Sequence, residues 1–438
     1  MTALSRRSAL RGALALGAAG LLTGCSESGP HPRRLRGPGP ARLSFWAWVP
    51  GIEKPVALWN SENPDVRVDL VRIPAARSGG YAKFYASLEA GQQPDLMQAE
   101  FSELPAMMMY GGLEELTQHG GDRYRSSFVD WIWQQGSYGG GVYAIPQASG
   151  PVALYYRKDL FDKWGIVPPR TWAEYEEAAE QVRSRDAHLG TFPPNNGQFM
   201  AALAWQAGAR WFGTKDQRWS VDIDNEPTRR VADYWQRLVR RDLVKTIPDS
   251  GSGWYKDLQD GRTVSWVGAH WADGVLRGGV PNGAGKWAVA PMPQWNDSGP
   301  FVASNLGGSS TAVVRGTAYP EEAMRFAVWL NTDPRSIALL LAGGFGWPAL
   351  KDNAHLAELH APSEYYGGQT ISQVFGAANA GVDTEWKWAP TTTQMMQHLA
   401  DGMGRAVAGQ GNLRDVLPET QRRTLRDMEK KGLPLSAG

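Results

Sequence analysis

A strand-like stretch near the middle of the chain ends in a tryptophan. In the segment Gly261–Asp273, GRTVSWVGAHWAD, side chains from Thr263 to Gly268 alternate at the period of a strand. Trp271 follows three residues after Gly268, and an indole offers a flat apolar face together with one N–H donor. The spacing predicts a rigid strand, Thr263–Gly268, that carries Trp271 at its end, whereas Trp266 inside the strand is expected in the core.

Tryptophan is unusually abundant throughout the chain. There are 20 Trp residues, against 14 Tyr and 12 Phe, although tryptophan is normally the rarest of the three. Core packing accounts for about half of them. The remainder would provide apolar platforms with a polar handle, which suit the C–H face of a sugar ring.

Two further candidate ligand residues stand where predicted strands end. Trp48 ends the strand RLSFWAW, and Glu100 follows the strand PDLMQ. In α/β sheets, ligands bind at the carboxyl ends of strands. A carboxylate at position 100 can accept hydrogen bonds from two adjacent hydroxyls, although a solvated acid at a helix N-terminus explains Glu100 nearly as well.

Sequence signatures of catalysis are missing. The chain has no GxSxG, HExxH, CxxC or Walker motif, and His355 and His360 are five apart, which is wrong for two ligands on one helical face. We therefore expect no catalytic residue, metal or cofactor. A glycosidase pair could still be drawn from the carboxylates near aromatic residues, which are Glu100, Asp273, Asp383 and Glu385.

Charge and composition narrow the class of ligand. The 438 residues include 45 basic and 44 acidic side chains, for a formal net charge of +1. This balance provides no attraction to nucleic acid, so the ligand is neutral or its charge is met locally. A content of 42% apolar and 20% charged residues is typical of a globular protein. The length of 438 residues predicts two or three domains.

The N-terminus resembles a bacterial lipoprotein leader over residues 1–24. Arginines precede an apolar run, Gly12–Leu22, that is too short for a membrane span. Leu22–Cys25 then resembles a lipobox, which implies lipidation of Cys25. Ser5–Arg7 resembles a twin-arginine export signal, although Ala9 stands where phenylalanine is usual.

Residues 25–41 are predicted to be a tether after the leader. The segment is rich in Ser, Gly and Pro, a composition typical of linkers. We expect its arginines at positions 33, 34 and 36 to face solvent, or to lie near anionic lipid headgroups.

Helical and strand periodicities then alternate along the chain. The order β-α-β-α over residues 43–110 predicts an α/β protein with a largely parallel sheet. Thr171–Glu174 forms a capping box that opens a helix to about Ser184. Asp333 is expected to cap another helix. Further helices are expected over 224–243, 320–331 and most of the last 50 residues.

Seven motifs in order resemble one known family. They are GQQPDL at 91–96, GLEELT at 112–117, GVYAIP at 141–146, YYRKDLF at 155–161, TWAEY at 171–175, Asp260–Trp271 and Gly307–Ser309. Together they are similar to the extracellular solute-binding proteins of ABC importers, of the maltose-binding (family 1) type. The resemblance covers nearly all of residues 41–438.

This resemblance implies a two-lobe, type II periplasmic-binding-protein-like fold with a multi-crossover hinge. The implied crossings are Gln147–Gly150, Pro300–Asn305 and Phe345–Leu350, which are rich in turn residues. Lobe one would comprise residues 41–148 plus 303–346, and lobe two residues 149–302 plus 347–438.

The same resemblance implies that ligand lies between the lobes. It places an aromatic residue at the cleft wall near Trp271, and it brings the three crossings to the site. Packing explains Trp205 and Trp388 as well as ligand contact does. The predicted ligand-binding residues are Trp48, Glu100, Gln147, Trp205, Trp271, Asn305, Gly307, Gly308, Trp347 and Trp388.

The sequence therefore predicts a binding protein rather than an enzyme. We expect a monomer, lipid-anchored outside the cell membrane through Cys25, that captures a sugar or short oligosaccharide and delivers it to an ABC permease. A receptor of the same fold for a polyamine, an anion or a metal is the first alternative. A secreted carbohydrate-active enzyme is the second.

Overall fold

A six-stranded sheet forms the centre of the first lobe. Its order is β15-β6-β14-β3-β1-β2, within a computed structural model that describes residues 34–436. The strands are β1 (Ala41–Ala47), β2 (Val66–Arg72), β3 (Leu96–Glu100), β6 (Ala144–Ser149), β14 (Ser309–Val313) and β15 (Trp347–Pro348). Around them lie α1 (Glu53–Glu62), α2 (Gly80–Glu89), α3 (Leu104–Met109), α4 (Asp130–Gln135), α11 (Pro320–Thr332) and α12 (Pro334–Ala342), with a hairpin of β4 (Ser137–Tyr138) and β5 (Gly141–Val142).

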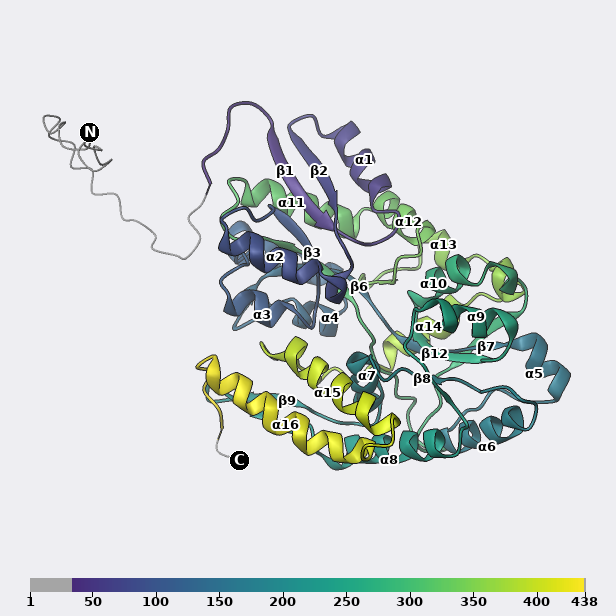
Figure 1. The fold of residues 1–438 in the computed structure, drawn as a ribbon. Coiled ribbons are helices and arrows are strands. Elements are labelled where there is room, and N and C mark those ends of the chain that lie inside the picture. Colours follow the sequence, from purple (N-terminus) through teal and green to yellow (C-terminus); the bar gives the residue numbers. More distant parts are fainter. Residues whose placement is uncertain (1–33, 437–438) are drawn as a thin grey trace, which may run out of the picture.

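A smaller sheet, β12-β7-β13, forms the centre of the second lobe. Its strands are β7 (Val152–Arg157), β12 (Ser265–Ala269) and β13 (Trp287–Pro291), and short pairs add β8 (Thr191–Phe192) with β11 (Lys245–Thr246) and β9 (Phe212–Lys215) with β10 (Arg218–Val221). The remaining helices are α5 (Lys158–Trp164), α6 (Trp172–Arg183), α7 (Gly197–Gln206), α8 (Glu226–Arg240), α9 (Ser252–Asp260), α10 (Ala272–Gly279), α13 (Ala357–His360), α14 (Ser372–Ala380), α15 (Thr392–Val407) and α16 (Leu413–Lys430). Figure 1 shows the two lobes as separate bodies, with β6 running between them.

The α/β class predicted from the sequence is confirmed, but strand direction differs from the prediction. Within the six-stranded sheet of the described residues, β1 pairs in parallel with β2 and β3, whereas β14 and β15 run antiparallel to their neighbours. In the second sheet, β7 is antiparallel to both β12 and β13. Parallel pairing needs a crossover that returns each strand in the same direction. Here β14 and β15 instead enter the first sheet from the second lobe.

Local sequence signals decide where individual helices begin. The Thr171 hydroxyl accepts a hydrogen bond from the Glu174 amide at 3.1 Å, and α6 starts at the next residue. Asp333 caps α12 by accepting from the Arg335 amide at 2.9 Å. Both caps satisfy amides that the first helical turn leaves without a partner, as the sequence predicted.

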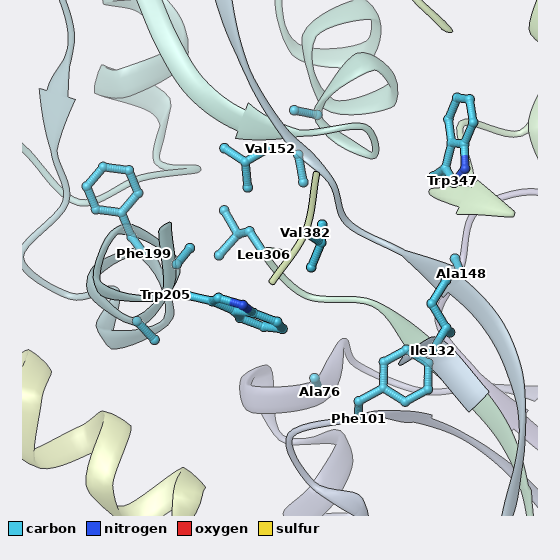
Figure 2. Close-up of a cluster of buried hydrophobic side chains, with 14 of the residues drawn as sticks. Ala76, Phe101, Ile132, Ala148, Val152, Phe199, Trp205, Leu306, Trp347 and Val382 are labelled. Carbon is cyan, nitrogen blue, oxygen red and sulfur yellow. The ribbon is translucent and has the colours of Figure 1, made fainter. Parts of the chain in front are cut away.

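One continuous hydrophobic core extends through both lobes. Figure 2 shows part of it, from Phe101 and Ile132 of lobe one through Leu306 to Trp205 and Phe199 of lobe two. The strand predicted at Thr263–Gly268 is observed at Ser265–Ala269, with every residue buried. It therefore lies inside this core and provides a stiff support for the residues that follow it.

The last residues of the predicted tether are docked on lobe one. Arg34 forms an ion pair with the buried carboxylate of Asp95, and its amide donates to the Gly316 carbonyl at 2.8 Å. Arg36 pairs with Glu322 at 3.0 Å. Both side chains remain exposed, at 42% and 57%, as expected of a solvated segment, but their ion pairs with carboxylates of lobe one were not predicted. Arg33 lies outside the described residues. Cys25 and the leader lie outside the described residues.

Candidate functional site

Three chain segments lie side by side where the lobes join. Val152 donates its amide to the Ser304 carbonyl at 3.1 Å, and Leu306 donates to the Gly150 carbonyl at 2.8 Å. A Cβ atom at Gly150 would stand 2.0 Å from the Leu306 carbonyl oxygen, so only glycine fits there. Trp347 pairs with Ser149 in the sheet of lobe one, which places Trp347 with lobe one and not with lobe two as predicted.

Asn305 links the segments of this junction through both the oxygen and the nitrogen of its side-chain amide. Its Oδ1 accepts from the Gly150 amide at 2.6 Å, and its Nδ2 donates to the Gly307 carbonyl at 2.7 Å. Gly307 and Gly308 have φ angles of +79° and +90°, a backbone region that favours glycine. These predicted site residues therefore shape the turn that leads into β14.

On the lobe one side, the ends of β1 and β3 bring Trp48 and Glu100 close to Tyr81 of α2. The rings of Trp48 and Tyr81 meet edge to face at 6.0 Å, and the Tyr81 hydroxyl accepts from the Glu100 amide at 2.9 Å. β1 and β3 are parallel, so their carboxyl ends share one edge of the sheet. This is the arrangement that the sequence predicted for Trp48 and Glu100.

A buried amide cluster lies at the same edge. It consists of Gln98 on β3, Gln147 on β6 and Ser309 on β14, which are 1%, 2% and 8% exposed. Gln98 Nε2 donates to Gln147 Oε1 at 3.2 Å, and the Ser309 hydroxyl donates to the same oxygen at 3.0 Å. Gln147 was predicted from its place in the first crossing, whereas Gln98 and Ser309 were missed because inward-facing polar residues on a strand carry no distinctive spacing.

On the lobe two side, Trp271 stands half-buried at the start of α10. Its indole N–H donates to the Leu306 carbonyl at 2.8 Å, and its ring meets Trp266 edge to face at 6.0 Å. A Cβ atom at Gly307 would lie 3.2 Å from the indole nitrogen. Trp271 is thus mounted on β12, as predicted, and lies against the second crossing.

Trp205 and Trp388 belong to a packed aromatic cluster. Trp205 is 1% exposed, stacks on Trp386 with ring centroids 4.9 Å apart, and donates its N–H to the Asp383 carbonyl at 2.8 Å. Trp388 meets both rings edge to face. The Trp131 ring of lobe one meets the Trp205 ring edge to face, with the ring centroids 6.3 Å apart, so the cluster joins the two lobes. Packing explains the burial of both residues, and their contact with a ligand stays a prediction.

His270 and Trp347 form a second aromatic contact at the junction. The His270 ring lies 5.5 Å from Trp347 and 4.9 Å from Phe375. Burial lowers the pKa of His270 to about 4, against an opposing effect of Asp273. The imidazole is therefore neutral near pH 7 and adds no charge to the site.

A polar clasp, defined here as Glu103 with Thr393, also joins the lobes. Glu103 directly precedes α3 in lobe one, accepts from the Tyr85 hydroxyl at 2.6 Å and accepts a further hydrogen bond from Thr393 in the first turn of α15. Nearby, Gln135 donates to the Trp386 carbonyl at 3.1 Å. The sequence contained no signal for this clasp, because its two members are 290 residues apart.

The junction offers mainly neutral polar and aromatic groups. No group of three or more His, Cys, Asp or Glu residues within 34–436 is arranged to hold a metal ion. Over the same residues, no helix has the length and apolar character needed to cross a membrane. The groups that the junction offers include amides, hydroxyls, indoles, the His270 imidazole and the carboxylates of Glu100 and Glu103.

Two α/β lobes, three crossing segments and a polar, aromatic-rich junction define a two-lobed ligand-binding protein. Residues 47–334 match the sequence profile of the bacterial extracellular solute-binding proteins. This match spans more than half of the chain, so the chain belongs to that family. The resemblance identified from the sequence is confirmed, and members of the family are binding proteins rather than enzymes.

Curated relatives support the same family. The lactose-binding protein of Rhizobium radiobacter is 25% identical over 378 residues, which cover 78% of this chain and 84% of that protein. The arabinooligosaccharide-binding protein of Halalkalibacterium halodurans is 26% identical over 312 residues, 68% of this chain and 69% of the relative.

Solved structures share the fold. The galacto-N-biose/lacto-N-biose I-binding protein of Bifidobacterium longum, in complex with lacto-N-biose, superposes with a TM-score of 0.82 at 24% identity and covers 92% of this chain and 100% of its own. An ABC transporter-associated binding protein of B. animalis subsp. lactis, with β-1,6-galactobiose, also gives 0.82 at 24% identity and covers 91% and 100%. The two-lobe fold predicted from the sequence is therefore confirmed.

Proposed function

We propose that this chain is the receptor subunit of a carbohydrate ABC importer. It would capture a sugar or short oligosaccharide between its lobes and present it to a membrane permease. The observation that carries this proposal is the junction itself, where Trp271 stands half-buried against Gly307 and a buried glutamine cluster lies at the opposing sheet edge. Relatives whose names specify lactose and arabinooligosaccharides support the choice of ligand class.

Neutral amides and indoles suit a neutral, hydroxyl-rich ligand. An indole covers the apolar C–H face of a pyranose, and amide and carboxylate groups hydrogen-bond its hydroxyl rim. A ligand that contacts both lobes favours the closed arrangement by its differential affinity for the two states. The three crossings would act as the hinge between the lobes, with Trp347 paired in the sheet of lobe one.

A thermal-shift screen tests the ligand class. The probes are lactose, β-1,6-galactobiose, arabinotriose and maltotriose, with spermidine, phosphate and zinc as probes of the alternatives. A ligand at a hundred times its Kd adds about 2.7 kcal/mol of stability, which is easily detected as a rise in Tm. Stabilisation by spermidine, phosphate or zinc and by none of the sugars would overturn the proposal.

Catalysis and oligomeric state follow from the same proposal. We expect the bound sugar to be recovered chemically unchanged after prolonged incubation, because the chain acts as a receptor. We also expect a monomer, measured by light scattering. Release of hydrolysis products would instead favour a carbohydrate-active enzyme.

Location at the membrane forms the last part of the proposal. Lipidation of Cys25 would hold the protein on the outer side of the cell membrane after export, with the twin-arginine route as a candidate. Cys25→Ser should release the protein from the membrane fraction and leave sugar affinity unchanged. Unaltered membrane retention of Cys25→Ser would refute the lipid anchor.

A further inference from the structure

Gln147 has a buried amide donor without a partner. Its side chain is 2% exposed, and its Nε2 forms no hydrogen bond to any residue of the described chain. An unpaired buried donor costs about 1–3 kcal/mol of stability. Such a group therefore needs an explanation other than folding.

The orientation of this donor follows from two backbone amides. Gln98 accepts from the Trp48 amide at 3.0 Å and from the Val49 amide at 3.1 Å. A backbone N–H can only donate, so the side-chain oxygen of Gln98 must face these two groups. The NH2 group of Gln98 must then point away from them.

That NH2 group determines the orientation of the next amide. Gln98 Nε2 lies 3.2 Å from Gln147 Oε1 and 3.4 Å from the Ser309 hydroxyl. If the Gln147 amide were flipped, two NH2 groups would face each other at that distance. The Gln147 side-chain oxygen must therefore face Gln98 and Ser309. Its NH2 group then points away from both residues.

The location of this donor relates it to the ligand. Gln147 lies in the first crossing, and Ser309 follows Gly307 and Gly308, whose turn lies against Trp271. The relay of hydrogen bonds from the Trp48 and Val49 amides through Gln98 to Gln147 thus ends at the junction of the lobes.

We infer that Gln98 is a positioning residue that holds Gln147 Nε2 as a preoriented donor to an oxygen of the bound sugar. This inference rests on the proposed carbohydrate-binding function and assigns one hydrogen bond within it. Preorganisation of the donor lowers the entropic cost of forming that bond. The stability lost in the free protein is recovered when the ligand oxygen accepts.

Thermal unfolding of the ligand-free protein tests the relay without any sugar. Gln147→Met removes the unpaired donor together with the oxygen that accepts from Gln98 and Ser309, and Gln98 can still donate to the Ser309 hydroxyl. Its Tm should therefore fall by clearly less than that of Gln98→Met. Gln98→Met leaves the Trp48 and Val49 amides unpaired, and its Tm should fall by roughly 2 °C or more. If Gln98→Met does not fold, Ser309→Ala provides a milder break, because Gln147 Oε1 then keeps only Gln98.

Calorimetric titration with lactose and β-1,6-galactobiose tests the ligand contact. Gln147→Met should bind about tenfold more weakly, which corresponds to about 1.4 kcal/mol. Monodeoxy analogues of the same sugars complete a double-mutant cycle. One hydroxyl should contribute to binding in the wild type and contribute nothing in Gln147→Met. Gln93→Met replaces another buried glutamine, at the opposite edge of the sheet, and should leave affinity unchanged.

The outcomes separate this inference from the proposed function. Gln147→Met with a Tm as low as that of Gln98→Met would show that the donor is paired, and it would overturn the inference. Wild-type sugar affinity in Gln147→Met would overturn it too. If the wild type binds neither sugar, the fault lies with the proposed ligand, and the Tm comparison still decides whether the donor is unpaired.

Discussion

Replacing Thr393 by valine removes one hydroxyl from the clasp between the lobes and changes little else. Thr393 donates to Glu103, which still accepts from the Tyr85 hydroxyl at 2.6 Å in the variant. Burial and the nearby Glu103 carboxylate raise the pKa of Tyr85, so this phenol stays a donor at all physiological pH values. The variant therefore leaves Glu103 hydrogen-bonded to Tyr85 and removes one contact between the lobes, which should weaken the proposed closed arrangement.

The size of the effect follows from the type of bond. A hydrogen bond to a charged acceptor contributes about 1.5–3 kcal/mol. Thr393 is only half-buried, so the lower end applies, and the closed state should lose a factor of about 10 relative to the open state. The apparent Kd varies inversely with the closed, binding-competent fraction. Affinity should therefore fall by up to about tenfold, with most of the change in the dissociation rate.

Stopped-flow tryptophan fluorescence and small-angle scattering measure this effect. Thr393→Val should release lactose up to about ten times faster, and its ligand-free radius of gyration should be equal to or larger than that of the wild type. Thr332→Val is the matched control, because that hydroxyl donates at 2.8 Å to the Val328 carbonyl within its own helix. Identical dissociation rates and scattering curves for the two variants would refute the clasp as a determinant of closure.

Three further predictions concern other parts of the molecule. Trp271→Ala should weaken sugar binding by about 2–4 kcal/mol, or roughly 30- to 1000-fold, with a modest change in the ligand-free Tm; a large fall in Tm at wild-type affinity would show that this indole only packs. Because burial holds the pKa of His270 at about 4, the unfolded chain binds a proton that the folded chain does not. Wild-type stability should then fall by up to about 3 kcal/mol as the pH drops from about 6.5 to about 4, and an equal fall in His270→Phe would contradict this. Arg34→Gln should lower the free energy of unfolding by about 1–2 kcal/mol, because it removes a partner of buried Asp95. Arg36→Gln breaks an exposed ion pair and should lower it by less than about 0.5 kcal/mol. Equal effects of the two substitutions in urea titrations would exclude a specific role for Asp95.

Local features of the chain were readable from the sequence, because they depend on residues close together along it. The caps at Thr171 and Asp333 need only the next three residues. The buried strand before Trp271 needs only alternation. Trp48 and Glu100 were placed at one sheet edge because β1 and β3 are close in sequence and parallel. The order of short motifs was sufficient to identify the family and its two-lobe fold.

Contacts between distant segments were decided only by the tertiary structure. The sequence could not predict that Arg34 docks on Asp95, that β7 is antiparallel to both its neighbours, or that Glu103 meets Thr393. It also left Trp205 open between ligand contact and packing, and the structure places that ring in a cluster from both lobes. Each of these contacts joins segments far apart in the sequence, and composition and periodicity carry no information about which distant segments meet.

At Gln147, the sequence determined one property of the side-chain amide and the tertiary structure determined another. Its place in a turn-rich crossing segment made it a candidate in the sequence. The direction of its NH2 group depends on Gln98, on Ser309 and on two backbone amides at the end of β1. These groups come from four separate strands or strand ends, and only their assembly into one sheet edge leaves a single donor without a partner. Sequence determined which groups were available, and packing determined the direction in which they point.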